Sequence, residues 1–373
     1  MRAAFWVAAA VVFYSYLGYV VWLWICSRMN PWPLRRGAHL PFVSVVMVVR
    51  DEETTLPRKI RNLSALDYPA DRIEFVVASD GSKDATNEIL ADAARADSRW
   101  RVLGDAELKG KASRLNEALG AARGEVVLFV DARQEIERNA LRLLMENFAE
   151  DTVGCASGEL MLGDQATGET EKGMGVYWRI EKRIRELESA SGSVVGATGA
   201  LYAARRALLI PLPPETILDD VFLPMHVARH ARVVFDERAR AWDSPDLGAQ
   251  REFGRKVRTL TGNYQLLQIA PWLMSAENPL RFRFISHKLM RLVSPFALAV
   301  MLVTSALVAQ PFYRAAFLLQ LFFYALSLIA LTRVQRGPVA RLANAALTFI
   351  VLNTAAVVAF ANFLTGRKEV WVR

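Results

Sequence analysis

Cysteine is almost absent from this 373-residue chain, which contains only Cys26 and Cys155. Two cysteines so far apart provide neither a disulfide framework nor the paired spacing of a zinc site. Each lies in an apolar run, so we interpret both as packing residues. The chain also lacks a basic low-complexity arm and any nucleic-acid-binding motif, although its net charge is +8. An anionic membrane surface or an anionic substrate explains this charge better than a nucleic acid does.

Apolar segments attached to a water-soluble body are indicated by the composition, which is 53% hydrophobic and 23% charged. Residues 3–26 form an apolar run long enough to span a bilayer. The run is longer than a signal peptide's apolar region and is not followed by a small-residue cleavage site, so we expect an uncleaved anchor at 1–27. Arg28, Arg35 and Arg36 follow directly, and the positive-inside rule places that end in the cytoplasm.

A second membrane-associated region is predicted near the end of the chain. Residues 271–292 mix aromatic, aliphatic and basic residues, which predicts an interfacial amphipathic helix, although a surface helix is the alternative. Three apolar runs follow, at 293–309, 315–331 and 342–364, and predict two to three membrane spans within 293–373. If all three runs cross, the basic tail lies outside the cell. The number of crossings therefore stays open.

Strand-like and helix-like segments alternate through residues 28–270. Predicted strands at 43–49, 73–78 and 124–130 are each followed by a helical pattern, which indicates a largely parallel sheet with right-handed crossovers. These strands end at Asp51, Asp80 and Asp131 respectively. Ligands of open α/β sheets bind beyond the carboxyl ends of the strands. The acids therefore predict a binding site at that edge, although a strand-capping aspartate in a turn is the plain alternative for Asp131.

Further charged residues stand at predicted helix starts. Asp80 opens an Asp-Gly-Ser sequence that would also cap the next helix. Lys111 begins a helix, where its ammonium group and backbone N–H groups suit a phosphate, but a solvated basic turn has the same composition. Asp219 and Asp220 precede a helix at 221–228, either as paired catalytic carboxylates or as helix caps.

Taken in order, these motifs resemble those of membrane-bound bacterial family 2 glycosyltransferases, the group that contains cellulose, chitin, hyaluronan and poly-N-acetylglucosamine synthases. The resemblance covers residues 43–268. It implies an α/β fold, with a Rossmann-like GT-A domain of mixed sheet at 28–270 and flanking transmembrane and interfacial helices. The implied location is the bacterial inner membrane, multi-pass, with the catalytic domain in the cytoplasm.

The resemblance also implies an activity and a set of site residues. A sugar would pass with inversion from a nucleotide sugar, preferably a UDP-sugar, to a lipid-linked or growing glycan acceptor. Asp220 would be the general base and Asp219 its tuning neighbour, with Gly196, Thr198 and Gly199 near the acceptor path. The donor would be bound by the following residues: Arg50, Glu52, Asp80, Lys111, Asp131, Arg133, Arg255 and Arg258.

Five positions depart from the family pattern. Asp51 replaces an asparagine and Arg255 replaces a glutamine. Ser79 replaces the first of two acids, Arg133 replaces the second acid of an Asp-x-Asp metal motif, and Thr259 replaces a tryptophan of the acceptor platform. Asp131 alone remains to share Mg²⁺ or Mn²⁺ with the donor diphosphate, so metal dependence stays open. Arg133 is an alternative donor to phosphate.

Two other functions remain open at this point. One is a processive polysaccharide synthase that also translocates its product, against which the missing tryptophan counts. The other is a non-catalytic nucleotide-binding or scaffold subunit of a polysaccharide secretion complex, against which the intact Asp220 counts. The sequence does not determine the sugar, the acceptor or the oligomeric state.

Overall fold

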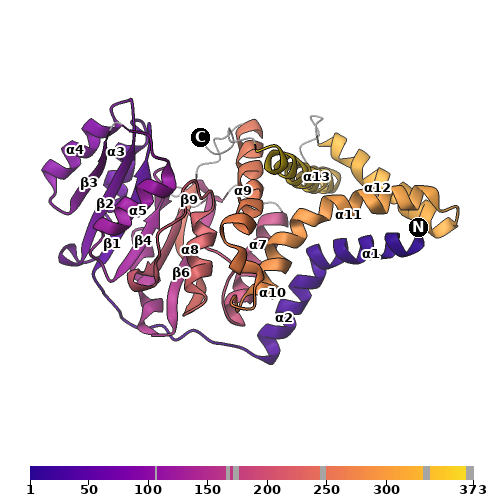
Figure 1. Cartoon of the computed structure of the whole chain (residues 1–373), viewed down its shortest axis with the longest axis horizontal. Coiled ribbons are helices and arrows are strands. Elements are labelled where there is room, and N and C mark those ends of the chain that lie inside the picture. Colours follow the sequence, from indigo (N-terminus) through magenta and orange to yellow (C-terminus); the bar gives the residue numbers. More distant parts are fainter. Residues whose placement is uncertain (106, 165–168, 171–175, 244–248, 331–336, 367–373) are drawn as a thin grey trace.

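A mixed β-sheet forms the centre of a soluble body, from which long apolar helices extend (Figure 1). The computed structural model describes residues 1–105, 107–164, 169–170, 176–243, 249–330 and 337–366. The sheet order is β3-β2-β1-β4-β8-β6-β9-β5, with β7 paired to β6. The strands are β1 (Val43–Val49), β2 (Ile73–Asp80), β3 (Trp100–Asp105), β4 (Val126–Val130), β5 (Glu135–Ile136), β6 (Val153–Asp164), β7 (Glu169–Thr170), β8 (Leu201–Arg205) and β9 (Arg232–Asp243).

The first four strands pair in parallel, as the alternation of strands and helices predicted. Strand β8 is antiparallel to both β4 and β6, which makes the sheet mixed and confirms the predicted fold class. At the centre, Val45 of β1 pairs with Phe75 of β2 and Leu128 of β4. All three are buried, as expected for inner strands covered on both faces.

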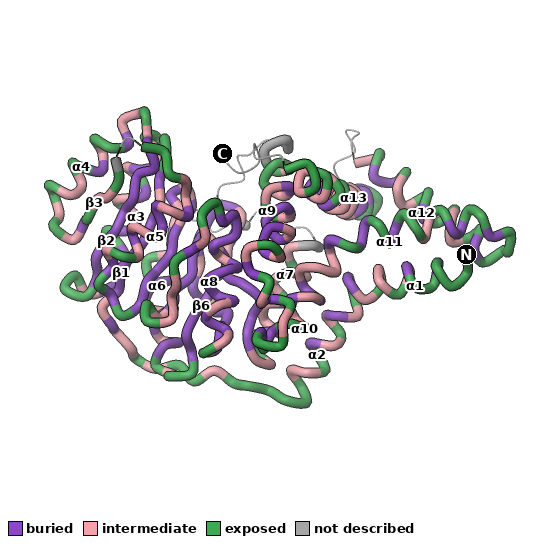
Figure 2. Tube along the Cα trace, viewed as in Figure 1, coloured by how far each residue is buried: buried purple, intermediate pink, exposed green. Residues whose placement is uncertain are grey.

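Helices cover both faces of the sheet. They are α3 (Leu56–Ser64), α4 (Thr86–Ala96), α5 (Lys111–Ala121), α6 (Ala140–Glu146), α7 (Val176–Ala190), α8 (Asp219–Val227) and α9 (Ala249–Ile269). Because side chains alternate along a strand, Val45 packs in one core with Leu90 of α4 and Leu144 of α6. Its neighbour Val46 packs in a second core with Leu115 of α5. Figure 2 shows this buried centre.

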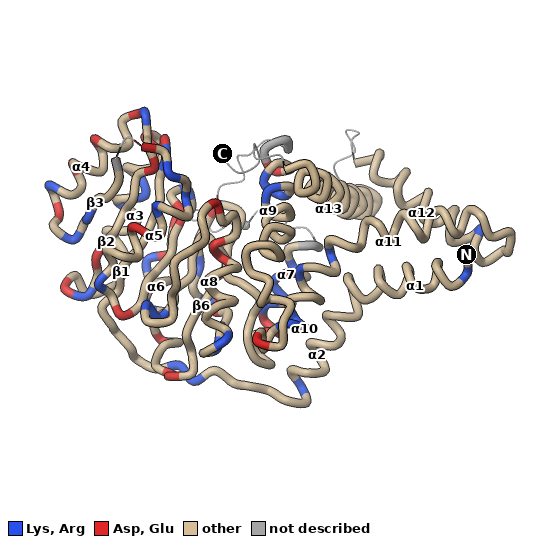
Figure 3. The backbone as a smooth tube through the Cα atoms, viewed as in Figure 1, with Lys and Arg blue, Asp and Glu red and all other residues tan. Residues whose placement is uncertain are grey.

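Four helices among the described residues are long and apolar enough to cross a membrane. The first joins α1 (Arg2–Phe13) and α2 (Tyr19–Met29) through a π-helical turn at Tyr14–Gly18. The second joins α10 (Arg281–Phe284) and α11 (Met290–Leu307) through another π-helical turn, and the others are α12 (Pro311–Ile329) and α13 (Pro338–Thr365). Figure 3 shows few charges along them. The basic tail, with Arg367, Lys368 and Arg373, lies outside the described residues.

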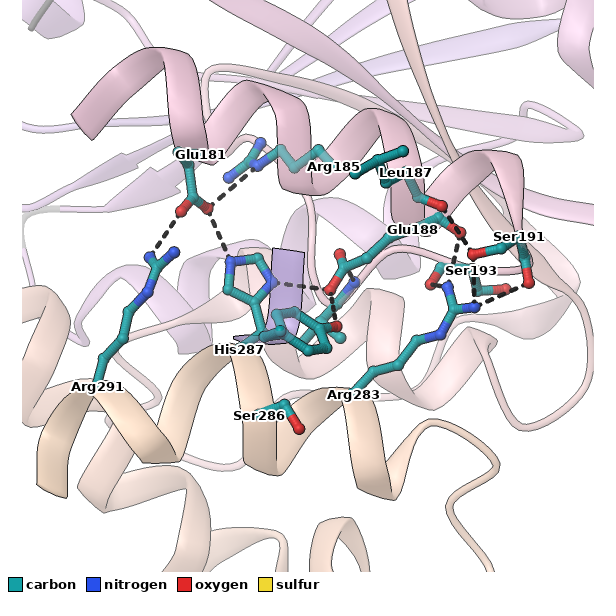
Figure 4. Close-up of polar contacts among 12 residues, drawn as sticks. Glu181, Arg185, Leu187, Glu188, Ser191, Ser193, Arg283, Ser286, His287 and Arg291 are labelled. Carbon is teal, nitrogen blue, oxygen red and sulfur yellow. Dashed lines mark hydrogen bonds and ion pairs between the residues drawn. The ribbon is translucent and has the colours of Figure 1, made fainter. Parts of the chain in front are cut away.

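The region 271–292 differs from the single interfacial helix that the sequence predicted. Pro271–Met274 is a short 3₁₀ helix, and α10 then runs without a break into α11. His287 is buried between Glu181 and Glu188 of α7 (Figure 4). Part of the positive charge in this region therefore belongs to ion pairs with α7, which a local pattern of basic and apolar residues cannot reveal.

Candidate active site

Lys111 contacts two carboxylates that are far apart in the sequence. Its Nζ lies 3.2 Å from Asp131 Oδ1 at the end of β4 and 3.3 Å from Asp219 Oδ1 at the start of α8. Burial opposes the charged form of Lys111, but Asp131, Asp219 and Asp220 outweigh it and raise its pKa above the ordinary value. Arg258 of α9 is close enough to act in the opposite direction. Lys111 is therefore a fixed positive charge at the carboxyl edge of the sheet.

Asp220 has the protonation behaviour of a general base. Burial, followed by the charge of Asp219, raises the pKa of Asp220 to about 6, while Lys111 lowers it. A carboxylate with a pKa near neutrality accepts a proton more readily than an ordinary aspartate does. Neither Asp219 nor Asp220 forms a side-chain cap on α8, so the structure does not support the helix-capping alternative.

Small residues surround Asp220. The backbone N–H of Ala197 donates to the Asp220 carbonyl oxygen at 2.7 Å. Gly196 has φ of +82°, which favours glycine. A Cβ at Gly199 would come to 3.1 Å from Asp220 Oδ2. The predicted segment of Gly196, Thr198 and Gly199 is therefore next to the predicted base.

Asp80 organises the loop that leads into α5. Its carboxylate accepts the backbone N–H groups of Lys109 at 2.8 Å and Gly110 at 3.0 Å. The buried guanidinium of Arg114 lies 3.5 Å away. Helix α4 begins at Thr86 without a side-chain cap, so Asp80 is not the cap of that helix. Asp80 instead fixes the start of the helix that carries Lys111.

Arg50 and Glu52 follow β1 at the same edge of the sheet. Arg50 Nε lies 3.6 Å from Asp51 Oδ2, and the Glu52 backbone N–H donates to Thr86 Oγ1 at 2.8 Å. Burial raises the pKa of the Glu52 carboxyl, with Arg133 lowering it and Asp131 raising it. Glu52 therefore lies near the turn that contains Asp131 and Arg133.

Asp243 is a site residue that the sequence analysis did not identify. It ends β9 and is only 2% exposed. Its Oδ2 binds the guanidinium of Arg133 and lies 3.7 Å from Arg255 Nη2 on α9. The available signal was an acid at the carboxyl end of a strand, but only residues 232–235 resemble a strand in the sequence, whereas β9 continues to Asp243. The buried carboxylate of Asp243 thus contacts both Arg133 and Arg255, two arginines that replace residues of the family pattern.

The carboxylate of Asp131 fits a metal that is shared with a ligand. Its side chain is 40% exposed, and Oδ1 is the atom that contacts Lys111. The described residues contain no group of three or more His, Cys, Asp or Glu side chains that could hold a metal ion alone. Mg²⁺ commonly binds one or two carboxylates and completes its shell with water and substrate phosphates. Asp131 therefore suits a metal held jointly with a diphosphate.

Sequence comparisons match the part of the chain that contains this site. Residues 44–211 match the family model for Glycosyl transferase family 2. Beta-monoglucosyldiacylglycerol synthase of Synechocystis is 26% identical over 195 residues, which are 51% of this chain and 41% of that protein. Poly-beta-1,6-N-acetyl-D-glucosamine synthase of Staphylococcus aureus is 20% identical over 269 residues, which are 70% and 63% respectively. The chain spans less than two thirds of the length of these curated relatives.

A solved structure matches nearly the whole chain. The mannosyltransferase PcManGT from Pyrobaculum calidifontis, in complex with GDP-Man and Mn²⁺, has a TM-score of 0.73. The match covers 98% of this chain and 99% of that one at 20% identity. At this identity the likeness concerns the fold, and it includes the apolar helices as well as the sheet.

Proposed function

Residues 44–211 form a GT-A domain of glycosyltransferase family 2, and on that premise we propose that the chain is an inverting glycosyltransferase of the bacterial inner membrane. Its donor is a nucleotide sugar, preferably a UDP-sugar, and its acceptor is a lipid-linked or growing glycan. The catalytic domain faces the cytoplasm. Four apolar helices and the arginines after the first of them support this placement.

The observation that carries the proposal is the position of Asp220 beside the charge pair of Lys111 and Asp131. Asp220 removes the proton from the acceptor hydroxyl, and the oxygen attacks the anomeric carbon in line with the leaving group. The bond from that carbon to the donor phosphate oxygen breaks, and the electron pair leaves with the nucleoside diphosphate. Lys111 and Arg258 stabilise the negative charge that develops on the diphosphate.

The other strand-end residues bind the donor in this proposal. Asp80 holds the Lys109–Gly110 loop, which supports a role in positioning Lys111 in addition to any contact with the nucleoside. Arg50 and Glu52 line the base and ribose side, and Arg133 and Arg255 contribute positive charge to the phosphate side. Asp131 would hold Mg²⁺ or Mn²⁺ together with the diphosphate, and such a metal would neutralise the leaving group. The Mn²⁺ and GDP-Man in the complex of the mannosyltransferase PcManGT support this assignment.

The acceptor is a saccharide or a lipid in this proposal. Two relatives support these classes, since one is a monoglucosyldiacylglycerol synthase and the other a poly-N-acetylglucosamine synthase. Gly196, Thr198 and Gly199 leave room for the acceptor next to Asp220, because a Cβ at Gly199 would meet the carboxylate.

The test is turnover by purified full-length protein in detergent with a panel of nucleotide sugars and bacterial lipid extract. Release of nucleoside diphosphate is measured with and without Mg²⁺. We expect one donor to be consumed, and Asp220→Asn to lose at least about 100-fold in transfer. Asp236→Asn is the matched control, because Asp236 is a buried carboxylate of β9 that pairs with Arg238 and Asn147. Normal transfer by Asp220→Asn would reject the mechanism.

A further inference from the structure

One side of α7 carries charged residues that face the second apolar helix (Figure 4). Glu181, Arg185 and Glu188 are spaced four and three residues apart, so they lie along a single stripe of the helix. The two glutamates are both buried. Buried carboxylates are costly unless hydrogen-bond donors and cations satisfy their oxygen atoms. Both glutamates therefore need partners from another part of the chain.

The two apolar helices nearest to α7 supply these partners. His287 lies between the carboxylates, with Nε2 3.0 Å from Glu181 Oε1 and Nδ1 3.0 Å from Glu188 Oε1. Arg291 Nη1 donates to Glu181 Oε2 at 2.6 Å. The hydroxyl of Tyr19, in the first apolar helix, donates to Glu188 Oε1 at 2.6 Å. Because an ionised carboxylate only accepts hydrogen bonds, both ring nitrogens of His287 donate, one to each glutamate.

A π-helical turn aligns the second apolar helix with α7. Arg283, His287 and Arg291 are spaced four residues apart, whereas an α-helical turn contains 3.6 residues, so this row would drift around an unbroken α-helix. The π-helical turn Ile285–Leu289 inserts an extra residue and offsets that drift. Arg283 Nη1 thus also reaches α7, where it donates to the carbonyl oxygen of Glu188 at 2.7 Å.

The same two glutamates hold a loop at 195–199, which lies between α7 and β8. Glu188 Oε2 accepts the backbone N–H of Val195 at 3.1 Å. Glu181 Oε1 lies 3.6 Å from Arg185 Nε, and Arg185 Nη1 donates to Thr198 Oγ1. The loop is therefore attached to α7 at two points, and each attachment leads back to one of the carboxylates that bind the histidine.

This loop contacts the proposed base directly. The backbone N–H of Ala197 donates to the carbonyl oxygen of Asp220 at 2.7 Å, and a Cβ at Gly199 would come to 3.1 Å from Asp220 Oδ2. The backbone N–H of Thr198 donates to Ser157 Oγ of β6 at 2.9 Å. A catalytic group must be held to within about 0.5 Å of its productive position. A shift of loop 195–199 would therefore move Asp220 out of that range.

We propose that His287 is a positioning residue for the base Asp220. It is only 1% exposed, so it acts through the two glutamates of α7 on loop 195–199. The inference rests on the proposed function, in which Asp220 is the base. Transfer is then fast only while the second apolar helix is docked on α7, because docking fixes both attachment points of the loop. The rate of the chemical step is thus coupled to the packing of a candidate membrane span.

The test measures kcat and donor KM of His287 variants in the full chain, reconstituted in phosphatidylcholine vesicles with the donor and lipid extract that support turnover. His287→Leu removes both hydrogen bonds, and we expect kcat to fall at least about tenfold through misplacement of the base. The donor KM should stay at the wild-type value. His287→Gln retains a donor near the position of Nε2, and His287→Asn retains one near Nδ1. Each of these two variants should recover part of the lost kcat.

Asp236→Asn is the control for a loss of stability without a loss of positioning. Asp236 is a buried carboxylate of β9 that pairs with Arg238, and its variant should keep the wild-type kcat. Chemical denaturation of all variants in the same detergent ranks their stabilities. If His287→Leu does not fold, the Gln and Asn variants carry the test, and each should then show a kcat below that of Asp236→Asn.

Three results would overturn this inference. They are a wild-type kcat in the folded His287 variants, a rise in donor KM that accounts for the whole loss of kcat/KM, and a kcat in Asp236→Asn that falls as far as that of an equally destabilised His287 variant. A wild-type kcat in the His287 variants together with an inactive Asp220→Asn would remove this inference alone. Normal transfer by Asp220→Asn would remove the proposed function as well.

Discussion

Asp243 Oδ2 forms a buried ion pair with the guanidinium of Arg133, across the edge of the sheet from the end of β9 to the turn after β4. The same oxygen accepts from Gln134 Nε2 at 3.2 Å and lies 3.7 Å from Arg255. The position where the family usually has a second acid thus holds an arginine, and a carboxylate from another strand neutralises part of its charge. The arginine at motif position 133 thus pairs with Asp243, a residue that is distant in the sequence.

Asp243→Asn should weaken donor binding and the fold together. Loss of the charge releases Arg133 and Arg255 from a common anchor, so the donor KM should rise about tenfold. The free energy of unfolding should fall by about 1–3 kcal/mol, because two guanidinium groups lose a buried carboxylate. Initial rates against donor concentration and chemical denaturation measure the two effects.

The matched control for that substitution is Asp236→Asn. Asp236 is fully buried on the same strand and pairs with Arg238 Nη2 at 2.7 Å. It should lose comparable stability and keep the wild-type donor KM. Equal donor KM values in the two variants would mean that Asp243 serves the fold alone.

Metal dependence should respond to the charge at position 133. Arg133→Asp combined with Asp243→Asn places two acids at the Asp-x-Asp spacing and avoids a second carboxylate opposite Asp243. Two acids hold a divalent cation more tightly than one does. The ratio of activity in Mg²⁺ to activity in EDTA should rise about tenfold above that of Asp243→Asn alone. An unchanged ratio would indicate that this turn does not contact the metal.

The sequence predicted the parts of the site that lie at the ends of its apolar strands. Asp131 lies at the carboxyl edge of the sheet, as the strand–helix alternation predicted, since parallel strands end at a common edge. Lys111 and Asp219 begin helices and meet Asp131 at that edge, which the alternation alone did not predict. The sequence analysis did not identify Asp243, because the second half of β9 contains Glu237, Arg238 and Arg240 and does not resemble a buried strand. Pairing with neighbouring strands holds that half of β9 in the sheet, and a local run of apolar side chains does not.

The contacts between residues 281–291 and α7 were not predicted, for a related reason. The basic residues of 281–291 resemble a membrane-interface pattern, but Arg283 donates to the carbonyl of Glu188, and His287 is buried against α7. Ion pairs between segments about 100 residues apart leave no periodic signal in either segment. Only the tertiary structure brings them together.

Asp220→Asn should stabilise the fold while it removes activity. Burial and Asp219 raise the pKa of Asp220 to about 6, which means that the ionised carboxylate is disfavoured in the folded state. At pH 7 a neutral amide of the same shape should therefore raise the free energy of unfolding by about 1–3 kcal/mol. Thermal and denaturant unfolding of the two proteins in the same detergent measure the difference. A less stable variant would contradict this account of the pKa.

The pH dependence of transfer should show an acidic limb near pH 6. Asp220 acts as a base only when it is ionised, so kcat/KM should fall about tenfold per pH unit below that value. Asp219→Asn removes a neighbouring negative charge that raises the pKa of Asp220, so the limb should move to lower pH. Initial rates in a constant-ionic-strength buffer series, with Asp236→Asn as the control, measure the limb. A limb that stays in place or moves to higher pH in Asp219→Asn would show that another group titrates. The substitution removes a negative charge beside Asp220, and this removal can only lower the pKa of Asp220.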